Sequence, residues 1–132
     1  MARPYIGGST ASSVSKTASF SLGPADHGKT FVLSGGAVTI TLPTLAGSLA
    51  GFSFRYISDS THNHVITGGA SVINYRGHYG GNHATQSGTD IHEDASTLTL
   101  NDGLRNDMVE LWTDGTRWYA HGITRNTMDA SA

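Results

Sequence analysis

The stretch DMVELWTDGTRWYAHG, residues 107–122, decides the fold class, because it has the pattern of two strands joined by a tight turn. Apolar and polar residues alternate on both sides of Asp114 and Gly115. A period of two residues is typical of a strand with one buried face and one wet face. Asp-Gly favours a two-residue hairpin turn. The stretch therefore predicts an antiparallel hairpin in an all-β protein.

The length of the turn determines which residues face each other across this hairpin. A two-residue turn pairs Leu111 with Trp118 and Val109 with Ala120 on the inner face, and Trp112 with Arg117 and Glu110 with Tyr119 on the outer face. Trp112 and Arg117 are then expected to form a cation–π contact. Trp112 and Tyr119 form an apolar patch that we predict to bind a partner. The alternative is that the chain's own long loop covers them.

Other segments repeat the alternation. In AVTITLP, residues 37–43, every second residue is apolar, and in GFSFRYISDS, residues 51–60, Phe52, Phe54 and Tyr56 alternate with Ser53 and Arg55. The residues expected on the core face are Val38, Ile40, Leu42, Phe52, Phe54 and Tyr56. Short strands of this kind, separated by glycine-rich turns, predict an antiparallel β-sandwich or squat β-barrel of about eight or nine strands.

Composition narrows the class of protein. The 132 residues fit one domain, and 17 glycines with abundant serine and threonine favour strands and turns. There is no cysteine, so we expect stability to come from the core or from neighbouring subunits. A net charge of −2 gives no basic footprint for nucleic acid. No apolar run is long enough for a membrane span, and the N-terminus lacks the apolar segment of a signal peptide.

The sequence divides into three parts. We predict an extended N-terminal arm over residues 1–16, a β-sandwich domain over 17–124 and a polar C-terminal tail over 125–132. Residues 76–95 show no sustained period and are interpreted as a long loop. Whether that loop faces solvent or a partner stays open at this point.

The predicted arm contains few apolar side chains, so it is not expected to order itself. Our hypothesis is that it runs over a neighbouring subunit or a capsid shell, adding a strand to a sheet edge. Its predicted partner-binding residues are Arg3, Pro4, Tyr5 and Ile6. The alternative is that the arm folds back on its own domain.

Seven histidines raise the question of a metal site. His62 and His64 would share one face of a strand, and imidazole is a common zinc ligand. Three further histidines fall in the predicted loop near acidic residues: His78, His83 and His92, with Asp90, Glu93 and Asp94. The spacing is generic, so we expect solvent-facing histidines, no metal and no cofactor. No nucleophile or phosphate-loop motif points to an enzyme.

Two stretches carry a resemblance to a known class of protein. GKTFVLSGGAVTITLPTLAG, residues 28–47, followed by GFSFRYI, residues 51–57, resembles a β-module of tailed-bacteriophage virion proteins. In VELWTDGTRWYAHG, residues 109–122, a D-G-T turn followed by W-Y and glycine is similar to the terminal hairpin of the same modules. From the first to the last, the stretches extend over residues 28–122, most of the chain.

The resemblance implies a non-enzymatic virion component, commonly a homotrimer. Its main implication is a capsid decoration (cement) protein that binds the major capsid protein on the outside of the assembled head, after synthesis in the host cytoplasm. The alternative is a module of a tail fibre or spike that binds a host receptor or glycan, with Tyr75, Tyr79, Trp112 or Tyr119 as sugar-stacking platforms. No catalytic residues follow from the resemblance.

Overall fold

The computed structural model describes residues 12–70, 72–80, 88–101 and 104–132. The strands are β1 Ser13–Lys16, β2 Phe20–Ser21, β3 Thr30–Leu33, β4 Thr39–Thr41, β5 Ser53–Ser58, β6 Val65–Thr67, β7 Ile73–Tyr79, β8 Gly88–Ala95, β9 Thr97–Leu100, β10 Met108–Thr113, β11 Trp118–Thr124 and β12 Met128–Ser131. Two short 3-10 helices, η2 Pro24–Asp26 and η3 Gly47–Leu49, precede β3 and β5.

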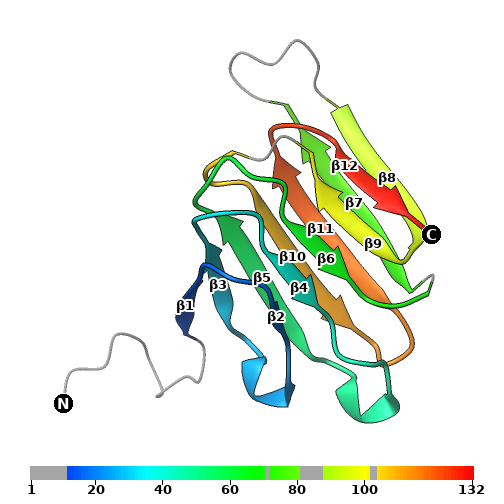
Figure 1. Ribbon diagram of the computed structural model, residues 1–132. Helices are drawn as coiled ribbons and strands as arrows, with labels where there is room; N and C mark the ends of the chain where they lie inside the picture. Colours follow the sequence, from blue (N-terminus) through cyan, green and yellow to red (C-terminus); the bar gives the residue numbers. More distant parts are fainter. Residues whose placement is uncertain (1–11, 71, 81–87, 102–103) are drawn as a thin grey trace, which may run out of the picture.

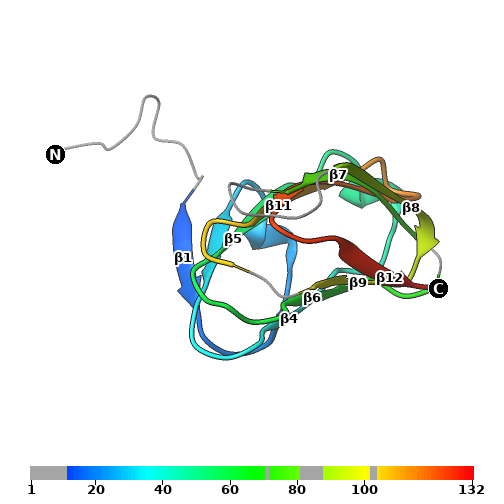
Figure 2. The same cartoon turned by 90° about the horizontal axis from the view of Figure 1, so that it is seen from above.

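The strands form two packed sheets, so the predicted all-β sandwich is confirmed. One sheet has seven strands in the order β1-β3-β5-β10-β11-β7-β8, and the other has five in the order β12-β9-β6-β4-β2. The two layers are seen edge-on in Figure 2. The strands outnumber the eight or nine that the sequence predicts, because exposed or polar strands such as Gly88–Ala95 and Met128–Ser131 leave little periodicity in the sequence.

The prediction of purely antiparallel sheets is wrong. Of the ten strand pairs, five are parallel: β1 with β3, β3 with β5, β2 with β4, β4 with β6, and β7 with β11. The four parallel pairs among β1 to β6 arise because these strands alternate between the two sheets (Figure 1). A chain that crosses to the other sheet after each strand returns to the first sheet in the same direction.

The core lies between the two sheets and confirms the predicted inner faces. Val38, Ile40 and Leu42 are buried, as are Phe52, Phe54 and Tyr56. Trp118 is fully buried and meets Phe52 and Phe54 edge to face, with ring centroids 6.0 and 6.3 Å apart. Edge-to-face contacts add to the free energy that apolar burial alone provides.

The predicted hairpin forms, but its register differs by two residues. Thr113 pairs with Trp118, so the loop has four residues instead of two, and Leu111 faces Ala120. The Asp114 carboxylate accepts hydrogen bonds from the backbone N–H groups of Thr116 and Arg117, which stabilises the wider loop and lowers the pKa of Asp114 to about 2. A register shift of two residues leaves every side chain on the same face of the sheet, but it changes the residue that lies opposite on the neighbouring strand.

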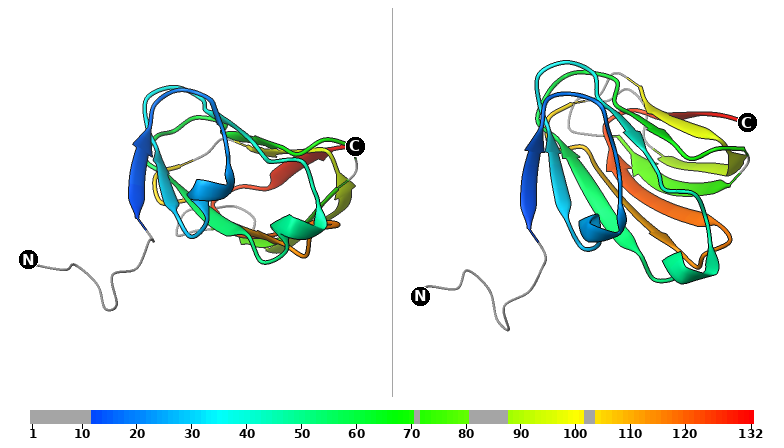
Figure 3. Two further views of the ribbon diagram at one scale, coloured as in Figure 1. Left: turned by 90° about the horizontal axis from the view of Figure 1, so that it is seen from below. Right: turned by 60° about the horizontal axis from the view of Figure 1, so that its bottom comes forward.

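The wider loop also packs against the short helix before β5. Figure 3 shows both 3-10 helices at the same end of the sandwich. Gly115 has a φ of +93°, and a Cβ there would lie 2.8 Å from the carbonyl oxygen of Ala46. Only glycine avoids both the unfavourable backbone conformation and that close approach.

Two segments predicted to lack regular structure are strands. Most of the predicted loop 76–95 belongs to β7 and β8, and residues 81–87 lie outside the described residues. Met128–Ser131, within the predicted polar tail 125–132, pairs with Thr97–Leu100. In β8, seven of eight residues are at least partly exposed, so the alternation that marks a buried strand is absent.

Side chains of β8 connect the two sheets along one edge of the sandwich. The Asp90 carboxylate accepts a hydrogen bond from the backbone N–H of Met128 at 2.6 Å, and His92 Nε2 lies 2.6 Å from the carbonyl oxygen of Met128. His92 also lies 3.0 Å from Asp90. Asp90 and His92 together anchor β12 to β8, the edge strand of the larger sheet, and close that side of the core.

Candidate functional site

The outer face of the seven-stranded sheet carries three rows of side chains that run across the strands. Strand register places Val32, Ile57, Met108 and Ile123 side by side, and we call these four residues the apolar row. The next row, here the charged row, consists of Arg55, Glu110, His121 and Arg76. The third contains Trp112 and Tyr119, here the aromatic pair.

The apolar row places large apolar side chains on a solvent-facing surface. Ile123 is 64% exposed, and Val32, Ile57 and Met108 are partly exposed. Scattered exposed apolar residues are ordinary on a monomer. Four of them adjacent on four neighbouring strands form a continuous patch, and such patches mark contact surfaces.

The aromatic pair is the predicted patch, and the structure brings its two members together. The rings of Trp112 and Tyr119 stack with centroids 4.6 Å apart and planes 22° apart. Trp112 remains 44% exposed, so within the described residues no loop covers it as the alternative required. Arg117 hydrogen-bonds Asp94 instead of forming the predicted cation–π contact, because the wider turn moves it away from Trp112.

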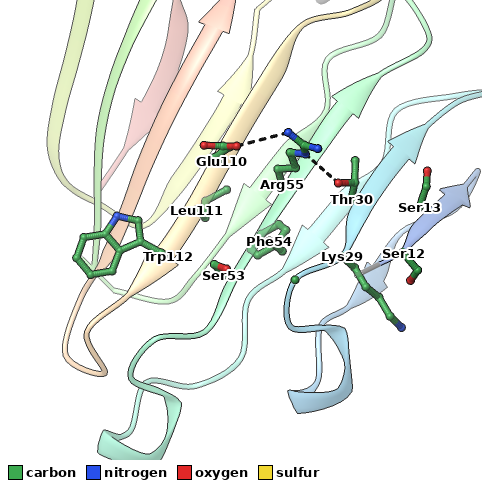
Figure 4. Close-up of a pocket in the computed structure, with 11 residues that line it drawn as sticks. Ser12, Ser13, Lys29, Thr30, Ser53, Phe54, Arg55, Glu110, Leu111 and Trp112 are labelled. Carbon is green, nitrogen blue, oxygen red and sulfur yellow. Dashed lines mark hydrogen bonds and ion pairs between the residues drawn. The ribbon is translucent and has the colours of Figure 1, made fainter. Parts of the chain in front are cut away.

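A groove extends from Trp112 across four strands of the same face. It is lined by Ser12, Ser13, Gly28, Lys29, Thr30, Ser53, Phe54, Arg55, Glu110, Leu111 and Trp112, and its volume is about 740 Å³. Figure 4 shows Trp112 at one end of this set and the two serines at the other. The volume falls in the range of small-molecule sites.

The cations in the groove already have anionic partners. Arg55 lies 3.6 Å from Glu110 and donates a hydrogen bond from Nε to the Thr30 hydroxyl at 2.8 Å. The Lys29 ammonium lies 2.9 Å from Asp26, which stands just outside the groove. The groove therefore presents donors and acceptors without a net excess of either charge.

The remaining predicted partner-binding residues cannot be placed. Arg3, Pro4, Tyr5 and Ile6 lie outside the described residues. The last residues of the predicted arm form β1, which pairs with β3 at the end of the seven-stranded sheet. The arm therefore precedes an edge strand. Of the proposed sugar platforms, Tyr75 is buried in the core and Tyr79 is partly exposed at the end of β7.

The structure does not bring the histidines together in the arrangements considered for a metal site. His64 is buried, whereas His62 is exposed, so they do not share a ligand-binding face. His92 binds β12, and His83 lies outside the described residues. Among the residues that the structure describes, no three histidine, aspartate or glutamate side chains are grouped so that they could hold a metal ion.

His64 has a structural role that the sequence did not indicate. Its Nδ1 accepts a hydrogen bond from the buried backbone N–H of Val38 at 3.1 Å. That bond assigns the proton of the neutral ring to Nε2, which lies 3.1 Å from the hydroxyls of both Ser58 and Ser60. Because the Ser58 hydroxyl donates to the Ser60 carbonyl, it accepts from Nε2. Burial, with a smaller contribution from His62, lowers the pKa of His64.

Asp107 is a second buried polar group that sequence analysis missed. Its carboxylate accepts hydrogen bonds from the backbone N–H of Leu104 at 2.9 Å and of Arg125 at 3.0 Å. Burial raises the pKa of Asp107, and these two hydrogen bonds oppose the rise. The residue fixes the chain before β10 to the end of β11. An isolated aspartate beside a strand has no pattern in the sequence that distinguishes it from a surface residue.

Comparisons with protein-family models, curated proteins and solved structures gave no match. Within the described ranges, no helix has the length and apolar character needed to cross a membrane.

Proposed function

We propose that this protein is a non-enzymatic structural protein of a tailed-phage virion, a capsid decoration protein that binds the assembled head as a homotrimer. The observation that carries the proposal is the apolar row, a continuous uncharged patch across β3, β5, β10 and β11. The sequence resemblance to virion β-modules supplies the class of assembly.

The chemistry of the apolar row suits contact with further copies of the same chain. Near a symmetry axis, each side chain approaches its own equivalent from the neighbouring subunits. Like charges in that position would repel, whereas isoleucine, valine and methionine gain free energy when they are buried together. The row lies toward one end of the strands, beyond the charged row, so contact there leaves the groove beside Trp112 accessible.

The second contact in the proposal joins the arm to the major capsid protein. Arg3, Pro4, Tyr5 and Ile6 supply one charged and three apolar or aromatic groups, and they precede β1 at a sheet edge. An extended segment that orders only on a partner covers a large surface, although it loses conformational entropy. Binding to the assembled shell and not to free subunits stabilises the shell by mass action.

Replacing Ile123 by aspartate is expected to abolish self-association. The change introduces a charge into the apolar row and does not alter the core, because the side chain is 64% exposed. Sedimentation equilibrium should show a trimer for the wild type and a monomer for Ile123→Asp, with at least a tenfold weaker association constant. Ile91→Asp is the matched control, since Ile91 is 52% exposed on the same face but lies outside the row. A monomeric wild type would contradict the proposal.

Removing residues 2–11 is expected to weaken capsid binding at least tenfold while the fold is retained, because the described sandwich begins after them. Cosedimentation with expanded empty heads measures the affinity, and the melting temperature checks the fold. A matched variant of full length carries Arg3→Ser, Tyr5→Ser and Ile6→Ser. Undiminished binding of both variants would mean that the arm is not the capsid anchor.

The alternative function, a fibre or spike module that binds a receptor or glycan, is favoured by a separate observation. The groove ends on an exposed tryptophan and has polar groups along its length. Saturable binding to whole host cells, with no binding to heads, would select this alternative over the decoration protein.

A further inference from the structure

The groove has the dimensions and direction of a site for an elongated ligand. Its lining residues come from β10, β5, β3 and the start of β1, so it crosses three spacings between strands, about 14 Å. Glu110 and Trp112 are two residues apart along β10, so the ion pair of Glu110 with Arg55 lies about 7 Å from the indole. A groove of this length can hold a ligand made of several linked rings, and it is longer than a ligand with a single ring needs.

Trp112 provides a flat apolar platform that is fixed before any ligand binds. Stacking on Tyr119 covers one face of the indole, and the 44% exposure of Trp112 leaves the other face accessible. The Tyr119 hydroxyl donates a hydrogen bond to Asp114, which holds the supporting ring in place. A fixed side chain loses little conformational entropy when a ligand covers it.

The polar groups of the groove suit a ligand rich in hydroxyls. Glu110 offers carboxylate acceptors and Arg55 offers guanidinium donors that Thr30 and Glu110 do not fully occupy, and serine hydroxyls extend the row (Figure 4). Both cations are paired with carboxylates, so an anionic ligand would have to compete with Glu110 and Asp26. A neutral ligand forms hydrogen bonds here without that cost.

We propose that this groove binds a short neutral oligosaccharide, with the C–H face of one sugar ring on Trp112 and hydroxyls of the next rings on Glu110, Arg55 and Thr30. Sugar rings combine an apolar face with hydroxyl edges, which matches an aromatic platform beside donors and acceptors. The groove uses none of the four residues of the apolar row, so the proposal does not depend on self-association.

The test measures binding of neutral trisaccharides with glucose, galactose, xylose or N-acetylglucosamine units to the full-length protein by NMR titration. At least one trisaccharide is expected to shift the indole N–H signal of Trp112 with a millimolar or lower dissociation constant. Trp112→Ala should weaken that binding at least tenfold, and Glu110→Gln should weaken it severalfold. Ile91→Ala is the control for a change on the same face outside the groove.

Each outcome bears on the proposal directly. Because Trp112 and Glu110 point outward, their variants should remain folded at the temperature of the titration, which a melting curve checks, and loss of binding then reports the site itself. No binding of any trisaccharide, or equal binding by wild type and Trp112→Ala, overturns the proposal. Stronger binding of a sialylated or sulfated trisaccharide than of every neutral one overturns the assignment of a neutral ligand.

Discussion

Alanine at Gly77 or Gly122 is expected to destabilise the protein by about 3 kcal/mol or more, because the added methyl group would overlap a buried ring. The two glycines face each other across β7 and β11, and the Tyr75 ring lies over both. A Cβ at Gly122 would lie 2.5 Å from the Tyr75 hydroxyl, and one at Gly77 would lie 2.6 Å from its Cζ. Tyr75 is only 2% exposed, so its ring cannot move aside into solvent without leaving the core.

Removal of the Tyr75 hydroxyl should restore different amounts of stability to Gly77→Ala and Gly122→Ala. Without that oxygen, the closest ring contact to a Cβ at Gly122 is 3.0 Å, which a small shift relieves. A Cβ at Gly77 would still meet the ring at 2.6 Å and the backbone oxygen of Gly122 at 2.9 Å. Tyr75→Phe should therefore recover much of the stability lost in Gly122→Ala and little of that lost in Gly77→Ala.

Urea denaturation of the single and double variants measures this difference as a coupling free energy between position 75 and each glycine. Gly36→Ala is the matched control, because a Cβ there meets nothing within 4 Å and its φ is not positive. Equal stability of Gly77→Ala and Gly36→Ala would show that the Tyr75 ring does not pack across β7 and β11 in solution.

The pattern of the sequence predicted which face each residue occupies more reliably than which residue it meets. Phe54, Leu111 and Trp118 are in the core as expected. Their partners were wrong in the hairpin, because Asp114 closes a wider loop with its own carboxylate. Alternation depends only on whether a position is odd or even, so a shift of two residues leaves it unchanged.

Strand direction could not be predicted from local patterns. The Gly35-Gly36 turn has the composition of a hairpin, yet the chain there crosses from β3 in one sheet to β4 in the other. Glycine allows both geometries, and the choice depends on which strands the rest of the chain provides as neighbours. The edge strand β8 escaped prediction for a related reason, because Gly88–Asp94 buries almost nothing and shows no period.

The candidate site was predicted in part. Trp112 and Tyr119 were expected on the outer face, and they are there. The apolar row was not predicted, because Val32, Ile57 and Met108 are distant in sequence and only the order of strands brings them together. Single apolar residues at outward positions carry no pattern until the sheet is assembled.

Replacing the buried His64 with alanine is expected to cost about 2–4 kcal/mol, because the change leaves a cavity and removes the acceptor for the Val38 N–H. The loss should appear as a lower urea midpoint with an unchanged slope. His62→Ala, an exposed change two residues away, should have little effect. Similar losses in both variants would contradict the role assigned to His64.

Burial of the same histidine makes stability depend on pH. The pKa of His64 is lowered from 6.5 in the folded protein, so the unfolded chain binds a proton more readily than the folded chain does. The contribution of neutral His64 to the free energy of unfolding is then complete above about pH 7.5. It decreases as the pH drops through 6.5 and levels off below the folded-state pKa. The slope in between reaches at most about 1.4 kcal/mol per pH unit. Protonation of Nδ1 would place two N–H donors, those of His64 and Val38, against each other.

Comparing the unfolding free energies of wild type and His64→Gln from pH 8 to pH 5 isolates this contribution from the other titrating groups. The wild type should lose more stability over that range than His64→Gln, although it is the more stable protein at pH 8. His62→Gln should keep most of the wild-type pH dependence, since His62 contributes less than burial to the lowered pKa of His64. Parallel profiles for wild type and His64→Gln would mean that His64 titrates normally, and therefore that its ring is not buried in solution as the structure has it.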